Sequence, residues 1–313
     1  MTRYHYIAIL SALLLAVWSC DQEETSPEIK VFPELSLETS DHQLIVTDQS
    51  SGTVRIYDQP TRCLLWCWSA SDSNILPAHR SWLKLADECK PVLDCSCLLI
   101  TASDGGAALV EIGTGKVRFY AYPGENPHSA EILPDGNIVV SSSKGYVTLY
   151  KYDPTTAYVP KPMARYELAG AHNAVWDARR NCLWVAGDAE MVKYAYDGSS
   201  LTVLARVALP ALWGHDLVPY RDEDRLVLTT GSSVNFFDPQ TMKFTTADCF
   251  KQGDIKSVSF GPMAICTTPT TSWWTPEVSN FHSGERVFFG VALQIYKARW
   301  RVPNTFSYGD YHK

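Results

Sequence analysis

The chain has 313 residues, 46% of them hydrophobic, and carries 27 Lys and Arg against 34 Asp and Glu, a formal net charge of −7. This acidic balance argues against a nucleic-acid binder, whose surface is normally basic. The length is sufficient for one large all-β domain with a full core.

The first twenty residues have the features of an export signal, which is read before any fold argument. Arg3 supplies a positive charge, and residues 7–17 form an uncharged apolar run that is too short to span a bilayer. Residues 17–20 (VWSC) resemble the lipobox of bacterial lipoproteins, although Trp18 stands where a small residue is usual. We expect cleavage before Cys20 and lipidation of its thiol. An ordinary secretory signal with an incidental cysteine is the alternative.

Residues 20–40 are predicted to form a flexible acidic tether. The run DQEE directly after Cys20 resembles the signal that sends lipoproteins of Bacteroides-type bacteria to the outside of the outer membrane. A solvated acidic linker has the same composition. We therefore expect a lipid-anchored protein of the outer membrane, at the cell surface or facing the periplasm, with residues 1–19 as signal peptide and 41–313 as one domain.

The remainder of the chain contains a repeat of about 41 residues. Each copy opens with a short polar step into an apolar strand, and three further strands follow a turn. The clearest copies open at His128, His172 and His215, a fourth opens at Lys256, and an earlier one contains Lys90. Four strands in 40 to 45 residues are typical of one blade of a β-propeller, so an all-β propeller is predicted.

The two ends of the repeat region complete each other. Residues 44–47, 54–57 and 64–68 are three predicted strands that lack the innermost strand of a blade, whereas residues 296–302 are predicted to form an innermost strand with no blade after it. Pairing them closes the ring and protects both sheet edges. The sequence therefore predicts six blades, with the C-terminal strand completing the N-terminal blade.

Aligning the predicted innermost strands brings one basic residue from each blade into register. Equivalent positions of these strands line the central channel. Six basic side chains at one level would favour an anion, since lysine and protonated histidine both bind carboxylate or phosphate. Contacts with channel water and backbone carbonyls are the alternative. The six residues are Lys90, His128, His172, His215, Lys256 and Lys297.

Other side chains are expected near this ring. Trp213 lies two residues before His215 and is placed to stack on a sugar ring. Asp216, together with Asp177 and Glu131, is close in sequence to the histidines and is a candidate to orient them or to act as acid or base. A simple turn role for Asp216 is the alternative.

Three neighbouring histidines also suggest a metal site. Neutral imidazoles of His128, His172 and His215 would hold a divalent ion such as Mn, Zn or Ca and leave a coordination position open. The eight cysteines beyond Cys20 lie mostly in apolar strand-like runs, so we expect them mainly to be buried thiols, with disulfide pairing as the alternative in an exported protein.

Two family resemblances follow from these motifs. Residues 88–92 (ECKPV), 127–136 (PHSAEILPDG) and 272–275 (SWWT) resemble an uncharacterised family of propeller lipoproteins from gut Bacteroides-type bacteria. More loosely, three histidines on channel strands are similar to the metal site of oligogalacturonate lyases, which have seven blades and a further metal ligand that has no counterpart here. The second resemblance implies a metal-dependent reaction on an acidic polysaccharide.

These observations predict a binding function at the channel mouth. The expected ligand is acidic, with a carboxylated or sulfated glycan as the main candidate, and the expected partners are this ligand and the membrane that holds the anchor. The chain is expected to be a monomer. The alternative is a metal-dependent lyase or hydrolase of acidic polysaccharide, so the sequence leaves open whether the protein is an enzyme.

Overall fold

The structure is a computed structural model that describes residues 41–221 and 223–308. The chain divides into two units, residues 1–30 and 31–313, and the described residues all belong to the second. The predicted signal peptide, Cys20 and the tether therefore lie outside the described residues. Within the described part, no helix is long and apolar enough to cross a membrane.

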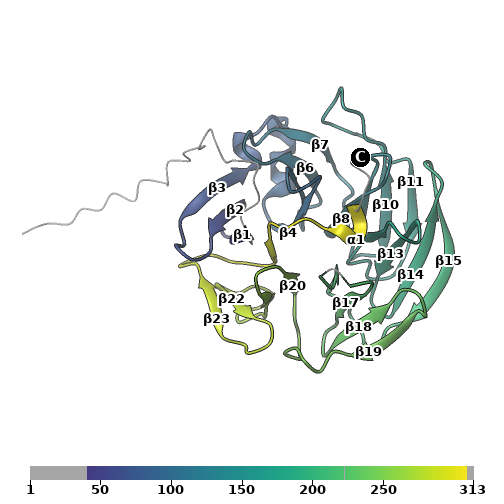
Figure 1. Ribbon diagram of the computed structural model, residues 1–313. Helices are drawn as coiled ribbons and strands as arrows, with labels where there is room; N and C mark the ends of the chain where they lie inside the picture. Colours follow the sequence, from purple (N-terminus) through teal and green to yellow (C-terminus); the bar gives the residue numbers. More distant parts are fainter. Residues whose placement is uncertain (1–40, 222, 309–313) are drawn as a thin grey trace, which may run out of the picture. The chain divides into compact units, whose positions relative to one another are not determined.

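The described residues form six four-stranded antiparallel sheets, arranged as the blades of a β-propeller (Figure 1). The all-β fold and the count of six predicted from the sequence are both confirmed. The first three blades contain β24 (Ala298–Trp300), β1 (Gln43–Asp48), β2 (Thr53–Asp58) and β3 (Leu64–Ser69); β4 (Ala86–Val92), β5 (Cys97–Ala102), β6 (Ala107–Glu111) and β7 (Val117–Ala121); and β8 (Pro127–Ile132), β9 (Ile138–Ser142), β10 (Tyr146–Tyr150) and β11 (Ala164–Glu167). The other three contain β12 (Val175–Asp177), β13 (Cys182–Ala186), β14 (Glu190–Tyr196) and β15 (Leu201–Ala208); β16 (Asp216–Pro219), β17 (Leu226–Thr229), β18 (Val234–Asp238) and β19 (Lys243–Thr246); and β20 (Ser257–Phe260), β21 (Ala264–Thr267), β22 (Glu277–Asn280) and β23 (Arg286–Phe289).

The ring closes through the pairing of the two ends of the described chain. Strand β24 lies antiparallel to β1, with Val46 opposite Ala298 and Leu44 opposite Trp300. This is the closure predicted from the incomplete N-terminal blade. It gives β1 a partner on each side, so the inner edge of β1 is not left unpaired.

Burial decreases from the channel outward in each blade. Every residue of the inner strands β4 and β8 is buried, whereas the outermost strand β15 has buried Leu201 followed by mainly exposed and half-buried residues. The continuous apolar runs of the sequence, such as residues 98–102, form second strands that are buried on both faces, because a blade packs against a neighbour on each side. Buried aromatic residues such as Trp184 of β13 and Phe237 of β18 pack edge to face between neighbouring blades.

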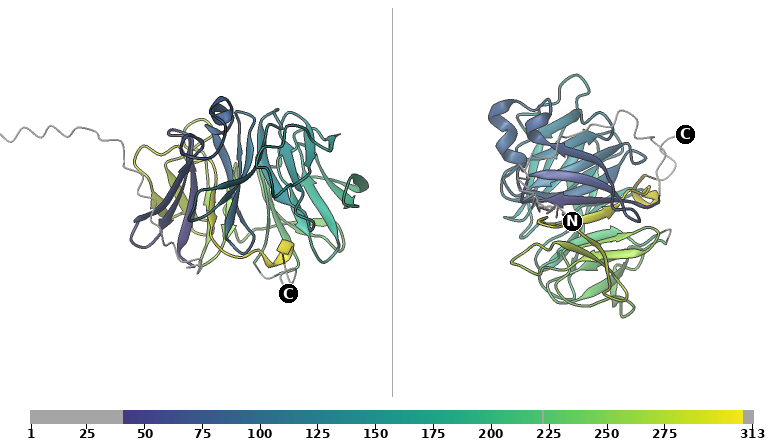
Figure 2. Two further views of the ribbon diagram at one scale, coloured as in Figure 1. Left: turned by 90° about the horizontal axis from the view of Figure 1, so that it is seen from above. Right: turned by 90° about the vertical axis from the view of Figure 1, so that its left-hand side faces the viewer.

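Helical structure is confined to connections. Two 3₁₀ helices, η1 (Ala70–Asp72) and η2 (Pro77–Leu83), link the first blade to the second, and the short helix α1 (Thr305–Tyr308) follows β24. We call the face where each innermost strand begins the entry face, and the face where it ends the exit face. Figure 2 shows α1 on the side opposite η2, so the segment after β24 crosses the exit face.

The cysteines of the described chain are free thiols. Five of them are buried, as the apolar runs around them predicted: Cys89, Cys95, Cys97, Cys182 and Cys266. Cys67 is half-buried, whereas Cys63 and Cys249 are exposed.

Candidate functional site

Strand pairing sorts the channel residues into three levels. Each residue of the central level pairs with a small residue at or near the end of the second strand of its blade, such as Thr101 or Thr229. Its members are Glu88, Ser129, Asn173, Asp216, Ser257 and Lys297. One residue earlier on each strand is the entry level, which contains Asp87, His128, His172, His215, Lys256 and Tyr296. Two residues later is the exit level, which contains Lys90, Glu131, Val175, Val218, Ser259 and Arg299.

Four of the six predicted ring residues share the entry level, and their side chains touch in sequence order. The rings of His128 and His172 are stacked with centroids 4.3 Å apart, and the rings of His172 and His215 meet edge to face at 5.5 Å. Nε2 of His215 lies 2.9 Å from Nζ of Lys256. The structure therefore brings together the row His128, His172, His215 and Lys256, which we call the histidine row.

The predicted register is wrong at the other two positions. Lys90 belongs to the exit level, and Lys297 belongs to the central level. Lys90 lies three residues after Asp87 on β4, and the spacing from Lys90 to His128 is shorter than the others for this reason. The β-bulge between Ala86 and Glu88 has a counterpart in β8, between Pro127 and Ser129. Asp87 and Tyr296 take the two places in the entry level, so the level is not a ring of six basic groups.

The central level is closed by a charge-balanced network. Nζ of Lys297 lies 3.1 Å from Glu88 and 3.2 Å from Asp216, and Arg299 binds both carboxylates at 2.6–3.0 Å while donating to the carbonyl of Val258. Burial alone would raise the carboxyl pKa values, but Arg299 and Lys297 hold the pKa of Glu88 and of Asp216 below their usual range. Two cations and two anions thus neutralise each other, and nothing is left to attract an anion.

The acidic residues near the histidines have partners other than the imidazoles. Asp216 belongs to the central network, and Glu131 accepts hydrogen bonds from Nζ of Lys90 at 3.2 Å and from the hydroxyl of Tyr308. Asp177 accepts from Arg180 and from the indole of Trp184. The expectation that these carboxylates orient the histidines is therefore wrong. Asp254 takes that place, with Oδ1 3.1 Å from Nε2 of His215, whereas Oδ2 of Asp87 lies 3.5 Å from Nδ1 of His128 without a hydrogen bond between them.

The histidine row does not have the geometry of a metal site. Stacked and edge-to-face rings place their faces against each other instead of directing three nitrogens at one point. No group of three or more His, Cys, Asp or Glu side chains in residues 41–221 and 223–308 is arranged to hold a metal ion. The predicted metal set of His128, His172 and His215 is not formed in this structure, and no reaction step is derived from it.

Two imidazoles of the histidine row are held in the neutral, unprotonated form. Burial, with the nearby charge of Lys297, lowers the pKa of His128 to about 3. Burial and the neighbouring His128 likewise lower the pKa of His172 well below its ordinary value. Asp254 stays ionised because hydrogen bonds from His215 and Lys256 lower its pKa in spite of its partial burial. The entry level therefore presents the neutral imidazoles of His128 and His172 beside the pair of Lys256 and Asp254.

Several polar atoms of the entry level and of the neighbouring Asn173 in the central level are buried without a hydrogen-bond partner among the described residues. They include Nδ1 of His128, Nδ1 of His215 and both amide atoms of Asn173, which lies one step below His172. These residues belong to three consecutive blades. A buried polar atom without a partner is costly, so the atoms around the histidine row are suited to a polar ligand that supplies hydrogen bonds.

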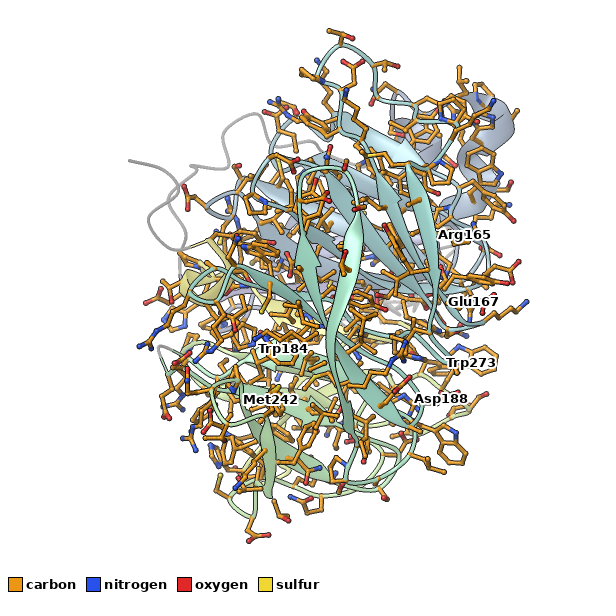
Figure 3. All side chains as sticks on the ribbon, turned by 90° about the vertical axis from the view of Figure 1, so that its right-hand side faces the viewer. Arg165, Glu167, Trp184, Asp188, Met242 and Trp273 are labelled. Atoms are coloured by element: carbon orange, nitrogen blue, oxygen red, sulfur yellow. The ribbon has the colours of Figure 1, made fainter. Side chains whose placement is uncertain are left out.

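Exposed aromatic side chains lie on the same face. Trp213 is 60% exposed and directly precedes Gly214 and His215, at the start of β16. Trp273 is 54% exposed, and its indole nitrogen donates to Gln49, which in turn donates to Asp87. Figure 3 shows Trp273 and the entry-face residue Asp188 on one side of the unit, with Met242 toward the other.

Sequence reasoning missed several residues of the channel, among them Asp87, Glu88, Asn173, Asp254, Tyr296 and Arg299. Tyr296 and Asn173 each adjoin a residue that was singled out, and Arg299 lies two positions after Lys297. If Lys90 and Lys297 are set aside, Asp87 and Tyr296 are the residues that keep the spacing between successive entry-level positions at 40 to 44 residues. Arg299 has no such signal, because its role depends on carboxylates from two distant blades.

The whole chain, residues 1–313, matches the model of a family of unknown function, DUF6528. The chain belongs to this family. No curated protein sequence matches it. The family carries no stated activity, so it supports the expectation of an uncharacterised family and no particular chemistry.

Two solved structures are similar in fold. A protein of unknown function from Bacteroides caccae is 13% identical, with a TM-score of 0.53 over 83% of this chain and 98% of that one. Hydrazine synthase from Kuenenia stuttgartiensis is also 13% identical, with a TM-score of 0.44 over 62% of this chain and 60% of that one. At such identity the first likeness supports the fold alone, and the second carries no argument.

Proposed function

We propose that the protein is a lipid-anchored binding protein that takes up a carbohydrate at the entry-face mouth of its channel. The observation that carries the proposal is the histidine row, with buried unpartnered nitrogens in His128 and His215. Sugar hydroxyls both donate and accept hydrogen bonds, so they complement neutral imidazoles and the amide of Asn173.

The tryptophans support a carbohydrate over a smaller polar ligand. Trp213 and Trp273 expose large apolar rings on the face that contains the histidine row. An exposed indole next to a polar pocket combines an apolar surface with a hydrogen-bond donor, which suits the mixed faces of a sugar ring. Their positions in loops outside the channel would hold the flanking units of a longer glycan.

Lys256 supports an acidic group on this glycan. Its ammonium lies 2.9 Å from Asp254 and from Nε2 of His215. A carboxylate or sulfate placed there would share the ammonium and gain a charge-assisted hydrogen bond. Because His128 and His172 are neutral, they add no attraction for a second acidic group.

The N-terminal sequence supports the proposed location of the protein. The lipobox-like residues 17–20 and the acidic run after Cys20 support an anchor in the outer membrane, with the propeller at the cell surface. Metabolic labelling with radioactive palmitate tests the anchor. The parent should be labelled and should sediment with membranes, whereas Cys20→Ser should lose both properties. An unlabelled parent would remove the anchor from the proposal.

Binding is tested by calorimetry with uronate-containing, sulfated and neutral oligosaccharides. The parent should bind the acidic sugars more tightly than the neutral ones. His172→Ala and Trp213→Ala should each lose at least tenfold in affinity, equivalent to about 1.4 kcal/mol. Phe289→Ala should bind like the parent. Phe289 is the matched control because it is an exposed aromatic residue on the outer strand β23. Negligible heat with every sugar, or equal heats for acidic and neutral ones, would contradict the proposal.

A further inference from the structure

The exit face has a cavity of about 520 Å³ that is separate from the histidine row. Its lining includes every member of the exit level: Lys90, Glu131, Val175, Val218, Ser259 and Arg299. Each blade thus contributes one residue at the same depth. The volume falls in the range of about 300–1,000 Å³ that is usual for small-molecule sites.

The floor of this cavity has charged groups but no free charge. Nζ of Lys90 donates to the carbonyls of Ala130 and Ala174 at 2.8 Å and to Glu131 at 3.2 Å. All five donors of Arg299 are used on Glu88, Asp216 and Val258. An ammonium has three donors and a guanidinium five, so neither cation of the floor has a donor left for a ligand, and both are neutralised by carboxylates.

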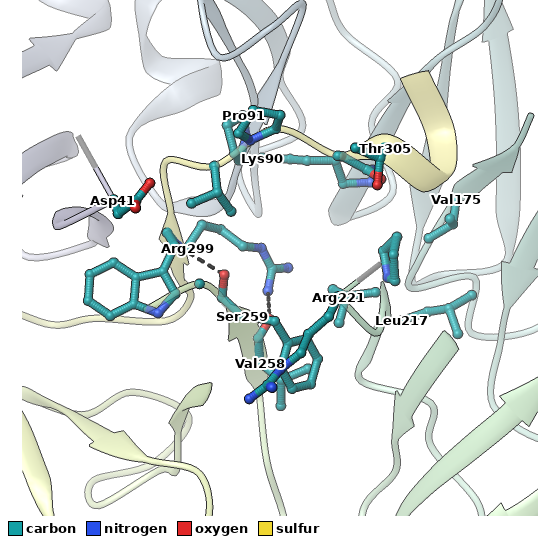
Figure 4. Close-up of a pocket in the computed structure, with 18 of the residues that line it drawn as sticks. Asp41, Lys90, Pro91, Val175, Leu217, Arg221, Val258, Ser259, Arg299 and Thr305 are labelled. Carbon is teal, nitrogen blue, oxygen red and sulfur yellow. Dashed lines mark hydrogen bonds between the residues drawn. The ribbon is translucent and has the colours of Figure 1, made fainter. Parts of the chain in front are cut away.

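The walls are mainly apolar. Leu217 and Phe260 from the inner strands of two blades face the cavity together with Trp300 of β24, and each is less than one-tenth exposed. The segment after β24 forms another side through Val302 and Pro303. Figure 4 shows this segment crossing the cavity from Arg299 toward the helix that begins at Thr305. A body that fills this space must be predominantly apolar.

Arg221 is the cation at the cavity edge that has capacity for a ligand. It is exposed, and in the described chain its only recorded interaction is with the ring of Tyr220, 5.8 Å from the guanidinium carbon. Asp41 also lines the cavity, and Figure 4 places it on the side opposite Arg221. A planar guanidinium with free donors matches a carboxylate in geometry and charge.

We propose that the exit-face cavity is a second binding site, which takes a small carboxylic acid with an apolar body and holds its carboxylate against Arg221. The apolar body lies over the neutral floor of the exit level. Because the site is separated from the histidine row by the charge network of the central level, it works independently of the carbohydrate site.

Calorimetry with naphthoate, naphthylmethanol and naphthylmethylamine tests this site, since the three probes share one apolar body. Naphthoate should bind most tightly, and Arg221→Gln should weaken it about tenfold, as expected for a charged hydrogen bond, without affecting naphthylmethanol. Arg286→Gln on β23 is the matched control and should bind naphthoate like the parent. Equal affinity for naphthoate and naphthylmethanol would overturn the role of Arg221, and preference for the amine would assign the polar group to Asp41 instead.

Two filling variants test the location. Val218→Trp occupies the cavity from the floor, and Thr305→Trp occupies it from the exposed start of α1, where the larger side chain is tolerated. Both should abolish naphthoate binding, whereas His172→Ala should not change it. If Thr305→Trp folds and binds naphthoate like the parent, or if the parent binds none of the three probes, the cavity is not the site. Either result leaves the carbohydrate proposal untouched.

Discussion

The central and entry levels of the channel are adjacent on the same strands, yet their polar groups behave differently. In the central network, Glu88, Asp216, Lys297 and Arg299 satisfy one another. One residue closer to the entry face, His128 and His215 keep buried nitrogens without a partner among the described residues. A fully paired polar network specifies a fold, whereas unpaired buried groups carry a cost that a ligand can offset. The difference indicates which level holds the ring together and which is available for binding.

The largest expected effect comes from removing the strand that supplies both cations. Deleting the chain from Ile295 onward removes β24, exposes the edge of β1 and leaves Glu88 and Asp216 buried without a counter-charge. We expect the cooperative thermal transition to be lost. Deleting residues 21–40, the predicted tether, is the control and should preserve it. A C-terminal truncation that melts like the parent would show that neither closure nor the network is required.

A single substitution separates the network from the closure. Arg299→Met keeps β24 but leaves two buried carboxylates facing one lysine, and we expect the free energy of unfolding to fall by about 3–5 kcal/mol. Arg286→Met breaks the exposed pair with Glu277, 3.5 Å long, and should cost about 0–1 kcal/mol. Urea denaturation measures both. Adding Glu88→Gln to Arg299→Met should recover part of the loss, and no recovery would contradict the charge balance.

The entry level should dominate the pH dependence of stability between pH 6.5 and about 3. Unfolded His128 takes up a proton near pH 6.5, whereas burial lowers the pKa of the folded residue to about 3. The unfolded state therefore binds more protons in this range, and stability falls as the pH falls, by up to about 1.4 kcal/mol per pH unit.

Comparison with His128→Asn isolates this contribution. The variant should lose stability less steeply than the parent as the pH is lowered through the same range, as measured by urea denaturation at several pH values. Asp87, whose pKa is raised by burial, acts in the opposite direction and is present in both proteins. Identical slopes for the two proteins would mean that His128 is not buried as a neutral group.

The smallest effect is expected at the middle of the histidine row. His172 is half-buried, and its recorded contacts are ring contacts with His128 and His215. His172→Asn should therefore change the free energy of unfolding by no more than about 0.5–1.5 kcal/mol, the usual value of an aromatic pair. A loss as large as that of Arg299→Met would place His172 in the structural network and remove the contrast between the two levels.

The repeat in the sequence determined the blade count, the closing strand and the placement of four basic residues at one level. A 41-residue period of short apolar strands has few other solutions, because each blade must bury both faces against its neighbours. The incomplete N-terminal blade predicted its partner strand for the same reason. The spacing of His128, His172, His215 and Lys256 was sufficient to align them, although His128 itself lies in a β-bulge between Pro127 and Ser129.

Only the tertiary structure decided what these residues face. Lys90 lies three residues after Asp87 and therefore two levels away from its expected position, and a shift of one residue moved Lys297 from the mouth to the central network. The pairing of Arg299 with Glu88 and Asp216 joins three blades whose order around the axis is not a local property of any of them. The local sequence determines the alternation of side chains along a strand. Which charged groups meet across the channel depends on strand register and on burial. Both are determined only when the ring closes.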